Sequence, residues 1–221
     1  THNIHPTYIQ EMLGDQRYDT DQKLSAINFL KTTGASFYNF ENMMKAVSGV
    51  SGSESGEWSA KNWARGKDIL IIGSGPSTKS YIEEIIGYIK RKNPVVLCLN
   101  INELIPNELV NAYVASRSSR LLIDSGRYKT LGKPIIMPLS RIPAEQKKLF
   151  LKTTIFDYGL SLKNEAFEIL DNGCILDTAL TINYAISIAT ASGANQILLT
   201  GVDGYDESDP RQLEMLSSIE R

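Results

Sequence analysis

The residues best suited to chemistry begin with a glycine turn that follows the apolar run 69–72. The turn consists of Gly73, Ser74, Gly75, Pro76 and Ser77. Glycines allow a tight bend and a close approach of the backbone, and the first turn of a following helix offers free N–H groups to an anion. The third glycine of a dinucleotide fingerprint is missing, and so is the Gly-Lys-Ser/Thr of a Walker A loop. We expect a nucleotide or phosphate here, and the alternative is a plain strand–helix turn.

Polar side chains also follow three other apolar runs. An asparagine amide suits the edge of a base or ribose, an arginine can pair with a phosphate through two N–H groups, and an aspartate can hold a ribose hydroxyl or a metal. The alternatives are a turn-forming asparagine, a solvated loop and a helix cap. The residues are Asn100 and Asn102 after 95–99, Ser116 and Arg117 at the end of 112–116, and Asp203 and Tyr205 after 196–200.

Histidine is absent from residue 6 to residue 221, and the two histidines, His2 and His5, lie at the N-terminus. Histidine is the commonest acid–base group near neutral pH, so any catalysis in the body of the chain must use other groups. Asp203, Tyr205 or Asp177 are the candidates for a catalytic base. We assign no metal site, because the two histidines have no further ligands near them in the sequence.

The elements that must position these residues alternate along the chain. Continuous apolar runs of four or five residues are typical of strands buried on both faces of a parallel sheet, and they alternate with helical patterns. We therefore predict an α/β domain with an open, mainly parallel, Rossmann-like sheet and helices on both faces. The predicted strands are 68–72, 95–99, 112–116, 134–137 and 196–200, and the predicted helices are 78–91, 143–151, 175–192 and 210–220.

Three parts are predicted along the chain. Residues 1–47 contain short helical patterns that bury little area alone. Residues 48–64 begin with a stretch rich in Gly and Ser, which is typical of a linker, and Trp58 and Trp63 at its end are expected to anchor the next domain by packing. Residues 65–221 form the Rossmann-like domain. Because the chain begins with Thr1, we expect it to be a piece of a longer protein.

Composition excludes several classes of protein. The 221 residues carry a formal net charge of −2, which argues against a nucleic-acid-binding protein with a basic face. No apolar run reaches the roughly 18 residues of a membrane span, and no signal peptide is visible. The two cysteines, Cys98 and Cys174, lie in apolar runs, which favours a reducing compartment and a cytoplasmic location.

Two motifs together resemble a known superfamily. ILIIGSGPS (69–77) and GCILDTALTINYAISIATASGANQILLTGVDGYD (173–206), with LNIN between them, resemble bacterial sialyltransferases that use CMP-sugars and proteins similar to hydroxymethylpterin pyrophosphokinase. The resemblance implies that residues 73–77 and Asn100 hold a nucleotide, with CMP favoured, and that Gly201, Asp203 and Tyr205 match a Gly-x-Asp-x-Tyr end. Two features depart from these families: the histidine base of the sialyltransferases is missing, and VASRSSR replaces the acidic magnesium ligands of the kinases. Whether a divalent metal takes part is left open.

The N-terminal stretch HNIHPTYIQEML resembles the helical tail behind the barrel of hydroxy-oxovalerate aldolases and HMG-CoA lyases. This implies an upstream aldolase-like domain as partner, a role in surface-polysaccharide synthesis, and contacts between subunits in a homo-oligomer.

Three functions remain open. The first is a nucleotide or nucleotide-sugar binding domain that serves an aldolase or lyase. The second is a glycosyltransferase with a CMP-sugar-like donor. The third is a structural domain that has lost its ligand.

Overall fold

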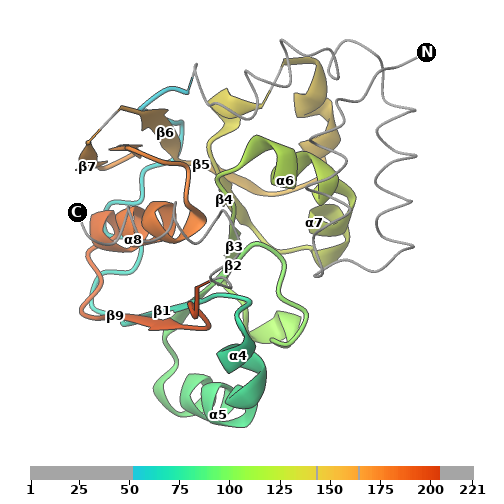
Figure 1. The fold of residues 1–221 in the computed structure, drawn as a ribbon, viewed down its shortest axis with the longest axis vertical. Helices are drawn as coiled ribbons and strands as arrows, with labels where there is room; N and C mark the ends of the chain where they lie inside the picture. Colours follow the sequence, from blue (N-terminus) through green and yellow to red (C-terminus); the bar gives the residue numbers. More distant parts are fainter. Residues whose placement is uncertain (1–51, 143, 164, 205–221) are drawn as a thin grey trace.

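A six-stranded parallel sheet forms the centre of the protein (Figure 1), whose computed structural model describes residues 52–142, 144–163 and 165–204. The strand order is β5-β4-β3-β2-β1-β9, and every neighbouring pair is parallel. The prediction of an open, parallel α/β sheet is therefore confirmed. The strands are β1 (Ile69–Ile72), β2 (Val95–Leu99), β3 (Ala112–Val114), β4 (Ile135–Met137), β5 (Ile155–Asp157) and β9 (Ile197–Thr200).

Helices cover both faces of this sheet. Figure 1 shows α6 and α7 on one side of the sheet and α8 on the other, and the core residues place α5 on the same face as α6 and α7. The α-helices are α4 (Pro76–Ser80), α5 (Ile82–Lys92), α6 (Ser118–Ile123), α7 (Ser125–Leu131) and α8 (Thr181–Ala191). Three short 3₁₀ helices are η2 (Asn107–Leu109), η3 (Leu139–Arg141) and η4 (Ala144–Phe150).

Strand β1 shows why a continuous apolar run is needed at the centre. Successive side chains of a strand point to opposite faces, so Leu70 and Ile72 pack against α5, whereas Ile69 and Ile71 pack on the side of α8. All four side chains are buried. A polar residue at any of these positions would face one of the two apolar layers.

A second, three-stranded sheet lies beside α8 and packs into the core on that face. Its order is β6-β8-β7, with β6 parallel and β7 antiparallel to β8. Its strands are β6 (Gly159–Leu162), β7 (Phe167–Leu170) and β8 (Gly173–Leu176). The sequence patterns did not predict this sheet or β5, because these strands are only three or four residues long and β5 and β7 are half-buried or exposed.

The part of the predicted linker that the structure describes, residues 52–64, is packed on the domain. The backbone N–H groups of Gly56 and Trp58 donate to the carbonyl oxygens of Asn172 and Asp157, each at 2.9 Å. The Trp58 ring stacks on Phe156 with 4.8 Å between ring centroids, as its predicted anchoring role requires. The glycines of this stretch thus permit close packing, and residues 52–64 pack against the same domain as the residues that follow them.

Two predicted helices have different bounds in the structure. The helix predicted at 78–91 is divided at Tyr81 into the short α4 and the longer α5. The helix predicted at 175–192 begins only at Thr181, because Gly173–Leu176 pair with strands on both sides as β8. The apolar steps between Ile175 and Ala179 come from a strand and a loop that happen to match a helical period.

The chain changes direction across the sheet between β1 and β9. From β1 the chain passes over one face through α5 to β2, and it returns over the opposite face through α8 to β9. These two strands are neighbours in the sheet. They therefore form the topological switch point, at whose carboxyl side open α/β sheets bind ligands.

Several predictions fall outside the described residues. They are the helical segment 1–47, the first residues of the linker, the final helix 210–220 and Tyr205. Among the residues that the structure describes, none of the helices has the length and apolar character required to cross a membrane.

Candidate functional site

The predicted polar residues lie at one edge of the sheet. Because the six strands are parallel, their carboxyl ends share an edge, and the loops after β1, β2 and β9 are hydrogen-bonded to one another there. The loop after β3 is joined to the loop before α8 at the same edge. The described loops therefore lie at one edge of the sheet, and their convergence on a single crevice stays a prediction.

The glycine turn after β1 is bonded directly to the loop after β9. The Gly73 N–H donates to the Thr200 carbonyl oxygen at 2.8 Å, and the Gly75 N–H donates to that of Gly201 at 2.9 Å. The Ser77 N–H, in the first turn of α4, donates to the Asp203 carboxylate at 2.9 Å. Asp203 is thus placed at the turn, as the sequence suggested, while its side chain remains exposed.

The glycines of the turn are required by the chain itself. A Cβ atom at position 75 would lie 2.1 Å from Asp203 Oδ2 and 2.7 Å from the Gly201 carbonyl oxygen, and one at position 73 would lie 2.3 Å from the Gly201 carbonyl oxygen. The sequence suggested that the missing side chain makes room for a ligand. The structure shows that it makes room for the β9 loop, so a larger side chain at position 75 would disturb the fold itself.

Asn102 holds the turn from the side of β2. Its amide nitrogen donates to the Gly73 carbonyl oxygen at 2.9 Å, its amide oxygen accepts from the Leu104 N–H at 3.0 Å, and the side chain is buried. The hydroxyl of Thr78 donates to the same Gly73 oxygen at 2.8 Å. Asn102 therefore fixes the position of the turn, and its amide is already engaged.

The side-chain amide of Asn100, unlike that of Asn102, is available to bind a ligand. It is half-buried at the end of β2 and adopts a left-handed backbone conformation with φ of 55°, which asparagine tolerates better than most residues. Its side chain has no hydrogen bond to any of the described residues. Together with the exposed Ser74, it forms the polar surface around the switch point.

Ser116 and Arg117 occupy the edge at the end of β3. The buried Ser116 hydroxyl donates to the Ala179 carbonyl oxygen at 2.7 Å and lies 3.1 Å from the Thr181 hydroxyl in the first turn of α8. Ser116 therefore joins β3 to α8, a role in the scaffold. Arg117 is the residue that begins α6 and is half-buried.

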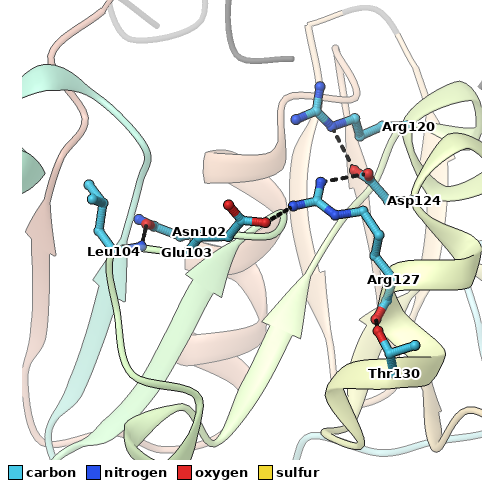
Figure 2. A network of polar contacts seen from close by, with 7 residues as sticks. All are labelled: Asn102, Glu103, Leu104, Arg120, Asp124, Arg127 and Thr130. Atoms are coloured by element: carbon cyan, nitrogen blue, oxygen red, sulfur yellow. Dashed lines mark hydrogen bonds and ion pairs between the residues drawn. The ribbon is translucent and has the colours of Figure 1, made fainter. Parts of the chain in front are cut away.

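A network of ion pairs, which the sequence did not suggest, supports this edge (Figure 2). The fully buried Asp124, between α6 and α7, forms an ion pair with Arg120 at 3.1 Å and accepts a hydrogen bond from Arg127 at 3.0 Å. Arg127 also pairs with Glu103, which follows Asn102 in the β2 loop. Burial lowers the pKa of Arg127, but Asp124 and Glu103 raise it by more, so the net shift is upward. The network fixes the β2 loop to α7.

Arg141 is a second residue that sequence patterns missed. It ends η3, after β4, and only 6% of its surface is exposed. Its carbonyl oxygen accepts a hydrogen bond from the Ser118 hydroxyl at 2.9 Å, next to Arg117. Burial lowers the pKa of Arg141, the nearby Tyr184 raises it, and the positive charge of Arg117 lowers it further. The stretch LSRIP carries no motif that could have identified it.

An open groove on the α5 face of the domain meets this edge at Thr200. It has a volume of about 330 Å³, lies beside α5 on the face of β1 and β9, and is lined by Leu70, Glu84, Ile85, Tyr88, Arg91 and Thr200. Two of its lining residues carry charge, Glu84 and Arg91, and a third, Thr200, accepts the hydrogen bond from the Gly73 N–H with its carbonyl oxygen. Groups of three or more His, Cys, Asp and Glu side chains that could hold a metal do not occur in the described part of the chain.

Comparison with known proteins does not assign this chain to a family. A scan against models of known protein families finds no match, and a search of curated proteins finds no match. The resemblances to sialyltransferases, to pyrophosphokinase-like proteins and to aldolase tails therefore remain predictions from the motifs.

Proposed function

We propose that the carboxyl edge of the sheet binds a nucleotide or nucleotide-sugar. The observation that carries the proposal is the switch point between β1 and β9, where loops from both strands are joined by hydrogen bonds. In open α/β sheets this is the position at which ligands bind. Ser74, Asn100 and Asp203 supply hydroxyl, amide and carboxylate groups that match the hydroxyls and base edges of a nucleotide.

The resemblance of the two motifs to CMP-sugar sialyltransferases makes CMP the first nucleotide to test. The separate resemblance of the N-terminal stretch HNIHPTYIQEML to aldolase tails suggests that this domain serves an upstream aldolase-like domain in surface-polysaccharide synthesis. Nucleotide binding is supported by the hydrogen bonds that hold the glycine turn in place and by the side-chain amide of Asn100. The proposal concerns binding and assigns no catalysed reaction.

The proposal is tested by thermal unfolding of the 221-residue chain with CMP, CDP, UDP, GDP or ATP, with and without Mg²⁺. A ligand at 100 times its dissociation constant stabilises by about 2.7 kcal/mol, which corresponds to a shift of about 5–10 °C in a chain of this size. If millimolar concentrations of every nucleotide leave the midpoint unchanged, the proposal is wrong.

A matched pair of variants tests the location of the site. Asn100 and Asn93 both have a left-handed backbone, with φ of 55° and 48°, and glycine accepts this conformation readily. Asn93 ends α5 and precedes β2, so it lies at the opposite edge of the sheet. Asn100→Gly should weaken nucleotide binding, measured by calorimetry, whereas Asn93→Gly should leave it unchanged. Equal effects would contradict the assignment.

A further inference from the structure

The glycine turn after β1 already holds a carboxylate of the chain. The Ser77 N–H donates to Asp203 Oδ2 at 2.9 Å, and the same oxygen would lie 2.1 Å from a Cβ atom at position 75, so it fills the space beside Gly75. The Gly75 N–H is also engaged, by the Gly201 carbonyl oxygen at 2.9 Å. Two of the N–H groups that such a turn would offer to an anion are therefore used within the chain.

The exposed carboxylate of Asp203 determines which ligand group suits this turn. A phosphate placed here would approach a like charge, and α4 has only five residues, so its dipole offers little compensation. An ionised carboxylate has about four acceptor sites and no donor, and among the described residues only the Ser77 N–H uses one of them. The turn is therefore suited to a neutral group that donates hydrogen bonds.

Two other polar side chains stand at the same level of the sheet. Strand β1 pairs in register with β2 on one side and with β9 on the other, and Ser74, Asn100 and Asp203 lie within three residues of the ends of these strands. Neighbouring strands are about 4.8 Å apart, so the ends of β9 and β2 are about 10 Å apart. The half-buried amide of Asn100 has no hydrogen bond to the described residues, and the Ser74 side chain is exposed.

A ribonucleoside has the groups that this arrangement requires. Its 2′ and 3′ hydroxyls are adjacent, so they can donate two hydrogen bonds to one carboxylate, and the edge of its base carries donors and acceptors that match an asparagine amide. The base and the diol are separated by the sugar ring, which suits groups on strands that are not direct neighbours. The 5′ carbon leaves the ring on the side away from the diol, so a diol at Asp203 directs the phosphate away from the turn.

We propose that Asp203 forms the ribose subsite of this edge, where its carboxylate accepts hydrogen bonds from the 2′ and 3′ hydroxyls of a ribonucleotide whose base lies beside Asn100. This inference rests on the proposed function and deepens it, because it names the ligand class as ribonucleotides in preference to their deoxy forms. It also reverses the role expected for residues 73–77, which hold the acceptor of the sugar and leave the phosphate outside the turn.

The test uses calorimetry on the 221-residue chain with CMP and ATP, each compared with its 2′,3′-dideoxy form, first with EDTA and then with Mg²⁺. The wild-type protein should bind the ribonucleotide about tenfold or more tightly, since hydrogen bonds to a charged group are lost in the dideoxy form. Asp203→Asn keeps an acceptor for the Ser77 N–H and should abolish this preference. Asp68→Asn makes the same substitution directly before β1, at the opposite edge of the sheet, and should leave the preference unchanged.

The outcomes separate this inference from the proposed function. Equal affinities for the ribo and dideoxy forms in the wild-type protein, or a preference that survives in Asp203→Asn, overturn the inference and leave nucleotide binding standing. Binding that requires both Mg²⁺ and Asp203 also overturns it, because the carboxylate would then hold a metal beside the phosphate. If none of these probes binds, the inference is wrong, and the thermal screen with the remaining nucleotides decides the proposed function. The wild-type comparison needs no variant, so it can refute the inference even if Asp203→Asn does not fold.

Discussion

Gly201 offers the sharpest test of how the β1 and β9 loops fit together. Its φ is +68°, and a Cβ atom there would lie 1.9 Å from the Thr78 hydroxyl and 2.6 Å from the Gly73 carbonyl oxygen. Gly193, after α8, has nearly the same φ, +70°, but a Cβ atom there would have no neighbour within 4 Å. The pair Gly201→Ala and Gly193→Ala therefore separates backbone strain from crowding.

The expected magnitudes follow from these surroundings. The left-handed conformation costs a residue with a Cβ about 1–2 kcal/mol, and part of this is offset because alanine restricts the unfolded chain. Gly193→Ala should therefore lower the free energy of unfolding by about 1 kcal/mol. Gly201→Ala carries the same strain and adds overpacking of about 1–3 kcal/mol, because Thr78 is fully buried and Gly73 is held by three hydrogen bonds. Its total should be about 2–4 kcal/mol.

Urea unfolding of both variants at 25 °C measures the difference. The unfolding midpoint should fall in each variant with an unchanged slope, since the surface exposed on unfolding is the same. If Gly201→Ala is no more destabilising than Gly193→Ala, the two loops do not pack as described, and the account of the site fails with them.

Three other predictions concern buried groups. Asn102→Asp should lower the free energy of unfolding more at pH 8 than at pH 5, because only the protonated acid can donate to the Gly73 carbonyl oxygen. Urea unfolding measures this, and an equal loss of stability at both pH values would contradict it. Burial raises the pKa of Cys98 to about 12 and that of Cys174 to about 12, so both thiols should react with a thiol reagent at pH 8 only after unfolding. Because the unfolded thiols lose their protons nearer pH 9, the free energy of unfolding should also fall as the pH rises above that value. Cys98→Ala should make this fall with pH less steep. Trp58→Ala should lower the free energy of unfolding by about 2–3 kcal/mol. If it destabilises the protein less than an exposed substitution such as Lys79→Ala, the stretch before residue 65 that contains Trp58 is not part of the folded unit.

The sequence predicted the strands that lie deep in the sheet and missed those at its margin. β1 and β2 are apolar at every position because both of their faces are covered, and this pattern is unmistakable. β7 is exposed or half-buried along its length, and β8 continues into a loop whose apolar residues imitate a helix. Local patterns do not record pairing with distant strands, so the small sheet could not be predicted.

The candidate site was predicted in position but not in detail. The parallel order of the strands placed Gly73, Asn100 and Asp203 at one edge, as expected. Sequence alone could not show that Asp203 would fill the first turn of α4, because that contact joins residues 126 positions apart. Arg141 was missed for the same reason, since only the fold brings it beside Arg117.

The docking of residues 52–64 also determines the order in which the domain can be completed during synthesis. The amide of Asn172 bonds the carbonyl oxygen of Gly56, 116 residues earlier in the chain, and Gly159 and Gly173 have no side chains where Glu54 passes over them. The ribosome needs on the order of 10 s to make the intervening chain. During that time Trp58 and Trp63 have no partner in Phe156 or Tyr158. The emerging chain therefore presents two tryptophans to chaperones until β5 and Tyr158 have been synthesised.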